Sequence, residues 1–263
     1  MNHTKAVLLA LLLLPLFLSA QVQELDCRYQ GSAKALDGNI YVLTVFTGER
    51  PWPKKAVDAI ITNVYEAQGW LEQQARRYGK TVSFTNGSFG HPDPIRYYVA
   101  TGTGSGNEST EVVWEVMKKI GYQNPADFVQ WAKDNADCDN ALVLVLTNTP
   151  GTSYALAYRD DFEREKYYLE GAVIYTTYQS GGETCSGSIA HEMCHLFGAE
   201  DLYETFSQTK ENEAKAQKLY PNDIMLRVSY DINELVVDEM TAWYIGLTNK
   251  EKSWYRDFLK HKQ

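Results

Sequence analysis

The sequence predicts an α/β fold built around a twisted, mainly parallel β-sheet. A β-branched and aromatic run at residues 40–47, a helical pattern at 54–78 and strand-like segments at 81–85 and 95–100 follow the order of a strand–helix–strand crossover. Residues 141–147 are uniformly apolar, which is typical of a central strand buried on both faces. A chain of 263 residues is long enough for one such domain, and nothing in it requires a second.

The first 20 residues differ in composition from the rest. Lys5 precedes an apolar run at residues 6–18, which ends in small residues. This pattern indicates a signal peptide at residues 1–20 and a single mature domain at residues 21–263. An uncleaved anchor is the alternative, although the run is short for a spanning helix. No cysteine ends the run, so we expect a secreted or periplasmic protein without a lipid anchor.

Helical patterns alternate with loops in the first half of the mature chain. The helix at 54–78 follows a Pro-Trp-Pro start and ends at Gly79. The segment GTGSG at residues 102–106 superficially resembles a phosphate-binding loop, but the glycine spacing is wrong and a flexible loop is expected. Two helices are predicted at 108–120 and 125–136 as an insertion between strands.

The acidic stretch at residues 134–139 lacks the spacing of an EF-hand loop, so it is interpreted as a solvated turn, and a structural Ca²⁺ is possible but unsupported. Strands are predicted at 153–158 and 170–176. Three helices follow at 208–219, 231–246 and 250–262, of which the first is charged and exposed.

The charge of the chain limits the classes of partner. It has 34 acidic against 25 basic residues, a net charge of −9, and loss of Lys5 with a signal peptide makes the mature chain more negative. Such a protein should repel nucleic acid and anionic membranes. We therefore expect no nucleic-acid partner and no membrane association beyond the export signal, and the sequence specifies no oligomeric state.

The run HEMCHLFGAED at residues 191–201 contains the motif H-E-x-x-H. Residues four apart lie on one face of a helix, so His191 and His195 can each place a ring nitrogen on the same metal ion. Glu192 can take a proton from a metal-activated water without being a ligand itself. The motif therefore predicts one catalytic Zn²⁺, with both histidines as ligands and Glu192 as the general base.

The end of this run predicts a third ligand. Gly198 can adopt the left-handed conformation that reverses a chain after a helix, and Asp201 follows three residues later. An Asp201 carboxylate gives three protein ligands and leaves one position for water, the arrangement of a catalytic zinc. Two other interpretations stay open: a structural or scavenging metal site, or two satisfied polar residues on a half-buried helix.

The same run resembles the metzincin signature H-E-x-x-H-x-x-G-x-x-H/D, in the Asp variant of snapalysin-like and immune-inhibitor-A-like secreted peptidases. Residues 221–225, PNDIM, are similar to the tight turn of that family, with Met225 as its methionine. The resemblance implies a zincin fold with an active-site helix, this Met-turn, a helical C-terminal part, and an antiparallel edge strand at 153–158 that pairs with an extended substrate. One departure is Arg227, where some metzincins have a tyrosine.

The four cysteines are Cys27, Cys138, Cys185 and Cys194, and an exported chain could form two disulfides from them. Cys185 and Cys194 are poor partners, because nine residues of helix separate their Cα atoms by about 13 Å. Cys27 with Cys138 is the preferred pairing. A second hypothesis makes Cys27 a thiolate that blocks the zinc, as upstream cysteines do in some metzincins.

We thus expect an exported zinc-dependent endopeptidase that acts on protein or peptide substrates. One alternative is a catalytically weak binding protein that keeps a zinc scaffold, although binding zinc does not need Glu192. Another is a gluzincin-type peptidase, in which Glu234 or Glu239 from a later helix is the third ligand.

Overall fold

The computed structural model describes residues 28–29, 31–99, 108–156, 169–205 and 208–259. The predicted signal peptide, Cys27 and the glycine-rich segment at 102–106 lie outside these residues. In chain order the elements are β1 Gly38–Thr47, α1 Lys54–Arg77, β2 Val82–Phe89, α2 Glu108–Lys119, α3 Pro125–Ala136, β3 Asn140–Gly151, β4 Tyr154–Leu156, β5 Gly171–Tyr178, α5 Ser186–Leu196, α6 Lys210–Leu219, the 3-10 turn η1 Ile232–Glu234, α7 Glu239–Tyr244 and the 3-10 turn η2 Tyr255–Phe258.

The sheet confirms the predicted fold class. Its five described strands have the order β2-β1-β3-β5-β4. All neighbours pair in parallel except β4, which is an antiparallel edge strand beside β5. The predicted edge strand at 153–158 is therefore present at Tyr154–Leu156, and residues 157–158 lie outside the described part.

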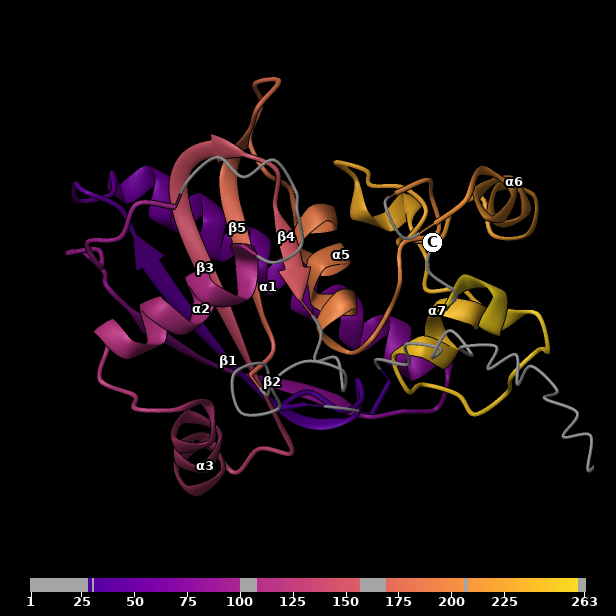
Figure 1. Cartoon of the computed structure of the whole chain (residues 1–263), viewed down its shortest axis with the longest axis horizontal. Coiled ribbons are helices and arrows are strands. Elements are labelled where there is room, and N and C mark those ends of the chain that lie inside the picture. The colour runs from indigo at the N-terminus through magenta and orange to yellow at the C-terminus, as the bar shows by residue number, and fades with distance from the viewer. Residues whose placement is uncertain (1–27, 30, 100–107, 157–168, 206–207, 260–263) are drawn as a thin grey trace, which may run out of the picture.

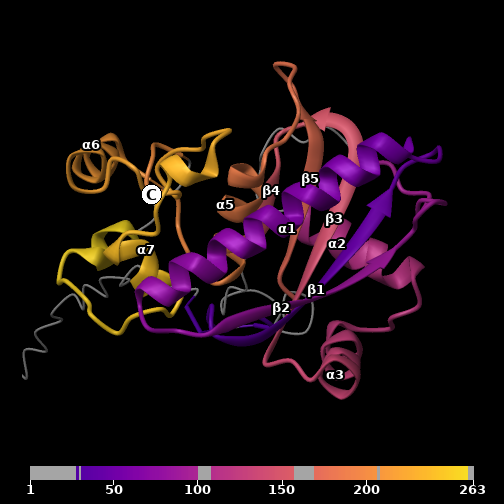
Figure 2. The same ribbon diagram turned by 180° about the vertical axis from the view of Figure 1, so that it is seen from behind.

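Side chains that alternate along the central strands are buried on both faces of the sheet. Ile40 and Leu142 belong to the core on the side of α1 and α5, whereas Tyr41 and Val143 belong to the core on the side of α2 and α3. Figure 1 shows α2 in front of the strands, and Figure 2 shows α1 across the opposite face. Burial on both faces explains why β3 is a continuous apolar run rather than an alternating one.

The C-terminal part packs beside the sheet rather than on its strands. In both views α5 lies between the sheet and the region of α6 and α7 (Figures 1 and 2). Buried residues of this region, among them Met225 and Trp243, belong to the same core as α1 and α5. Within the described residues, no helix combines the length and apolar character needed to span a bilayer.

The prediction of a strand at 95–100 is wrong for residues 95–99, the part that the structure describes. Ile95 makes only an isolated parallel bridge with Thr47, and residues 96–99 form no strand. β1 already has β2 and β3 as neighbours, so a further segment finds free hydrogen-bonding groups on it only beyond the end of β2.

The two long C-terminal helices were also predicted wrongly. The segment 231–246 divides into η1 and α7, because residues between them pair with the Met225 turn: the Val236 N–H donates to Asn222 O, and Val236 O accepts from the Ile224 N–H. The segment 250–262 contains only the short turn η2 within its described residues. In the segment 231–246, hydrogen bonds to a distant part of the chain therefore outweigh the local helical periodicity.

Candidate metal centre

The histidines lie on α5, a helix that is buried almost all round. Cys185 precedes it in an extended conformation, and all of its residues except His195 are buried. The helix packs against α1 and lies beside β4 and β5. His191 is thus held in the interior, and the side chain of His195, which is 17% exposed, marks the side that opens to solvent.

Gly198 ends this helix in the way predicted. Its φ of 95° is in the left-handed region, its N–H donates to His195 O, and the Ala199 N–H donates back to Cys194 O. The reversal turns the next residues back over the last turn of α5. As a result, Ala199 O contacts the ring of His195, and Asp201 reaches both histidines.

The side-chain atoms of His191, His195 and Asp201 form a nearly equilateral triangle. The two Nε2 atoms are 3.2 Å apart. Asp201 Oδ1 lies 3.2 Å from Nε2 of His191 and 3.3 Å from Nε2 of His195. Ligands of a tetrahedral zinc, with metal–ligand distances of about 2.0–2.1 Å, are separated by about 3.3 Å, so these three atoms match three corners of one coordination sphere.

Hydrogen bonds to the backbone fix which ring nitrogen of each histidine carries a proton. Nδ1 of His191 is 2.8 Å from Ile224 O, and Nδ1 of His195 is 2.8 Å from Ala199 O. A carbonyl oxygen only accepts, so each Nδ1 is the donor and each neutral ring has its lone pair on Nε2. Both lone pairs therefore lie at the triangle, as metal ligation requires.

Three lone-pair atoms at these distances repel one another unless a positive charge lies among them. Asp201 Oδ1 is buried and has no hydrogen-bond donor among the described residues. Burial favours a neutral His195, but the negative charges of Asp201 and Glu192 outweigh it and raise the pKa of His195, so the surroundings of this ring favour a positive charge. Burial opposes the charge on Asp201 as well, yet the two imidazoles hold its pKa below the usual range. The residues present thus fit a cation.

Glu192 is buried beside this triangle without being part of it. Its Oε2 has no hydrogen-bond partner among the described residues, and burial raises the pKa of its carboxyl group. The charges of His191 and His195 are close enough to act on it. A buried, unpaired carboxylate next to a cation site is free to take and return a proton.

Tyr203 lies beside the metal centre, although the sequence did not predict it as a site residue. Its ring stacks on that of His191, with centroids 6.2 Å apart and an angle of 28° between the planes. Burial, followed by the charges of Asp201 and Glu192, raises the pKa of Tyr203. Its only sequence signal is an aromatic side chain two positions after a predicted ligand.

The predicted turn at 221–225 contacts His191. Ile224 supplies the carbonyl that accepts from His191, and Met225 is fully buried. Arg227, whose role the sequence left open, donates from Nη2 to Glu234 Oε2 at 2.9 Å on the surface.

The acids considered as alternative third ligands are engaged elsewhere. Glu234 pairs with Arg227, and Glu239 pairs with Lys252. Among the described residues, the group of side chains able to hold a metal consists of His191, His195 and Asp201. The geometry therefore offers no support for a gluzincin arrangement.

Cys138, Cys185 and Cys194 are buried free thiols. Cys27, which we considered as the partner of Cys138 or as a zinc-blocking thiolate, lies outside the described residues. Burial raises the pKa of the Cys194 thiol, which keeps it protonated although it stands next to His195 in sequence.

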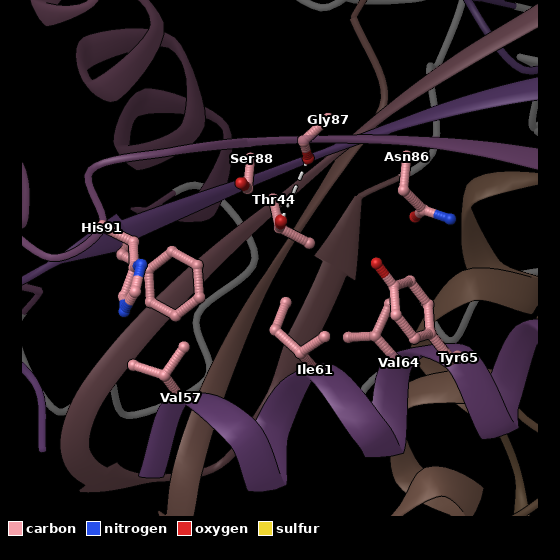
Figure 3. A pocket seen from close by; sticks show the side chains of 10 residues that line it. Thr44, Val57, Ile61, Val64, Tyr65, Asn86, Gly87, Ser88 and His91 are labelled. Carbon is pink, nitrogen blue, oxygen red and sulfur yellow. Dashed lines mark hydrogen bonds between the residues drawn. The ribbon is translucent and has the colours of Figure 1, made fainter. Parts of the chain in front are cut away.

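A pocket of about 170 Å³ lies away from the metal centre, between α1 and the ends of β1 and β2 (Figure 3). Val57, Ile61 and Val64 form its apolar side, and His91 and Ser88 lie opposite. Thr44 Oγ1 donates to Gly87 O across its wall. None of the residues that line it belongs to the histidine–aspartate group.

Two solved structures are distantly similar to this chain. No protein-family model and no curated protein matches the chain. A solved structure of metalloproteinase-II from Bacteroides fragilis is similar at 12% identity and a TM-score of 0.43, over 84% of this chain and 55% of that one. A zinc-dependent peptidase from Methanocorpusculum labreanum strain Z is similar at 14% identity and a TM-score of 0.32, over 84% of this chain and 100% of that one. This chain therefore spans about 55% of the length of the Bacteroides protein.

Proposed function

We propose that the chain is an exported zinc-dependent endopeptidase with a metzincin-like domain at residues 21–263. The observation that carries the proposal is the triangle of His191 Nε2, His195 Nε2 and Asp201 Oδ1, with sides of 3.2 to 3.3 Å and both Nδ1 atoms bound to carbonyls. Two imidazoles and one carboxylate suit zinc, whereas calcium and magnesium favour sites made only of oxygen ligands. Export is supported by the leader pattern of residues 1–20.

In this proposal, bound zinc would polarise the scissile carbonyl and lower the pKa of a water molecule to about 7. Glu192 takes the proton from that water and delivers it to the leaving amine. Its burial and its unpaired Oε2 suit both steps, because no described donor is hydrogen-bonded to that atom.

The substrate in this proposal binds as an extended chain along β4. β4 is the last strand in the sheet order, it is antiparallel, and it lies beside α5. A peptide added to this edge would be held by main-chain hydrogen bonds, which do not depend on the side chains of the substrate. The proposed partner is therefore a protein or peptide with an unfolded segment.

The test starts with the purified protein and a reduced, unfolded protein substrate. We expect one zinc ion per chain, cleavage within the substrate chain, loss of cleavage with a chelator and its return when zinc is added. Glu192→Gln should keep the zinc but lose several orders of magnitude in turnover, because base and metal act on the same water. A zinc-loaded parent without cleavage, or a variant as active as the parent, would contradict the proposed reaction.

A further inference from the structure

The turn at residues 221–225 is shaped around the side chain of Asp223, which is fully buried. Asp223 Oδ1 accepts from the Met225 N–H at 2.7 Å and from the Thr241 hydroxyl at 2.8 Å. Its Oδ2 accepts from the Asp238 N–H at 2.8 Å. The Asp223 carboxylate thereby joins the turn to the start of α7, where Asp238 is the N-cap residue and Thr241 lies in the helix.

The same turn contacts two of the three candidate ligands. Ile224 O accepts from Nδ1 of His191 at 2.8 Å, and Met225 O accepts at 2.9 Å from the N–H of Leu202, the residue after Asp201. The Ile224 carbonyl is in the same peptide group as the Met225 N–H that Asp223 binds, and the Met225 carbonyl is in the next peptide group. A shift of this short segment would therefore move the partner of His191 and the anchor of Asp201 together.

Further backbone bonds limit how the segment can move. The Ile224 N–H donates to Val236 O, and the Val236 N–H donates to Asn222 O. These bonds fix one side of the turn, while Asp223 fixes its centre from within. His195 is independent of all of them, because its Nδ1 partner is Ala199 O at the end of its own helix.

We infer that Asp223 is a positioning residue of the metal centre: through the turn it shapes, it sets the orientation of His191 and the approach of Asp201. The inference rests on the proposed zinc site, and it assigns to Asp223 a role beyond stabilising the fold. Mutation of a group that orients a metal ligand from outside the coordination sphere typically weakens metal affinity by about 10- to 100-fold.

The critical variant is Asp223→Asn. Its Oδ1 can still accept from Met225 and Thr241, but its amide group stands opposite the Asp238 N–H, so two donors face each other. Thr47→Val is the matched control, since it also removes a buried hydrogen bond, from Thr47 Oγ1 to Leu146 O at 2.8 Å, in the sheet. Both variants should lose stability, but only Asp223→Asn alters the turn.

Two measurements on folded protein separate positioning from stability. Zinc affinity by competition with a chelator should fall about 10- to 100-fold in Asp223→Asn and stay within threefold of the parent in Thr47→Val. In NMR spectra of the full mature chain, the Nδ1–H signal of His191 should shift in Asp223→Asn while that of His195 stays in place.

Unchanged zinc affinity and an unchanged His191 signal in folded Asp223→Asn would overturn the inference. If that variant does not fold, Thr241→Val decides, because it removes only the hydroxyl donor to Asp223: a selective shift of the His191 signal with weaker zinc binding supports the inference, and parent-like behaviour overturns it. Neither readout needs cleavage, so a parent that binds zinc without peptidase activity would refute the proposed reaction alone. If the parent binds no zinc, the proposed function fails, and the His191 signal still tests the role of Asp223.

Discussion

At the scale of single residues, the site depends on atoms that only accept hydrogen bonds. Ile224 O and Ala199 O direct the protons of His191 and His195 away from the triangle, and Asp201 brings a third acceptor to it. The arrangement is unfavourable without a cation and favourable with one. Removing the Asp201 carboxylate should therefore weaken metal binding more than removing any nearby surface carboxylate.

Asp201→Ala tests this directly. It should weaken zinc affinity by far more than Glu239→Ala, because Asp201 Oδ1 lies within 3.3 Å of both imidazoles while Glu239 pairs with Lys252. Chelator competition on both folded variants gives the comparison. A parent-like Asp201→Ala protein beside a zinc-free Glu239→Ala protein would move the third ligand to α7.

Asp223 gives a prediction about pH. Burial raises the pKa of its carboxyl group from 3.8 to about 7 in the folded protein. A group whose folded-state pKa is raised favours folding when protonated, so its contribution is present below the unfolded value and is lost as pH rises through the folded one. In this chain the loss falls between pH 3.8 and about 7.

Urea unfolding of the parent and of Asp223→Asn across that range measures this contribution. The free energy of unfolding of the parent, relative to that of the variant, should decrease as pH rises, by up to about 1.4 kcal/mol per pKa unit. A difference that is constant or increases with pH would show that folding does not raise the pKa of Asp223.

At the scale of elements, the end of α5 decides whether Asp201 can reach the histidines. Gly198 has a φ of 95°, and its hydrogen bonds match those of Gly79, with a φ of 74°, at the end of α1: each glycine N–H donates to the third residue before it, and the next N–H donates to the fifth residue before it. The two helices therefore end with the same hydrogen-bond pattern, but only the end of α5 is followed by a candidate ligand, Asp201.

This likeness provides a matched pair of variants. Gly198→Ala and Gly79→Ala should each lower the free energy of unfolding by about 1–2 kcal/mol, because alanine is strained in the left-handed region. Only Gly198→Ala should also weaken zinc binding. Equal zinc affinities in the two folded variants would show that the reversal at Gly198 does not set the position of Asp201.

At the scale of the whole molecule, the metal centre joins two parts of the chain. His191 and His195 come from α5, which packs against α1 and lies beside β4 and β5. The turn at 221–225, whose Ile224 carbonyl binds His191, belongs to the C-terminal part. Val237, which follows the residue paired with the turn, also contacts α1, because its N–H donates to Gln74 Oε1 at 3.1 Å. Zinc should therefore stabilise both parts together.

Metal removal tests this coupling. At free zinc about 100 times the dissociation constant, the folded protein should gain about 2.7 kcal/mol over the chelated state. Thermal unfolding with buffered zinc measures the gain, and Glu192→Gln should keep it while Asp201→Ala loses most of it. A zinc effect absent in the parent, or undiminished in Asp201→Ala, would argue against this centre.

The sequence by itself determined the elements whose signal is local. Spacing alone placed His191 and His195 on one helix face, the apolar run at 141–147 identified a central strand, and Gly198 marked the helix end. The tertiary structure alone decided what these elements contact. The carbonyls of Ile224 and Ala199, the stacking of Tyr203 and the division of the helix predicted at 231–246 depend on hydrogen bonds and packing between distant segments, which periodicity in one segment does not encode.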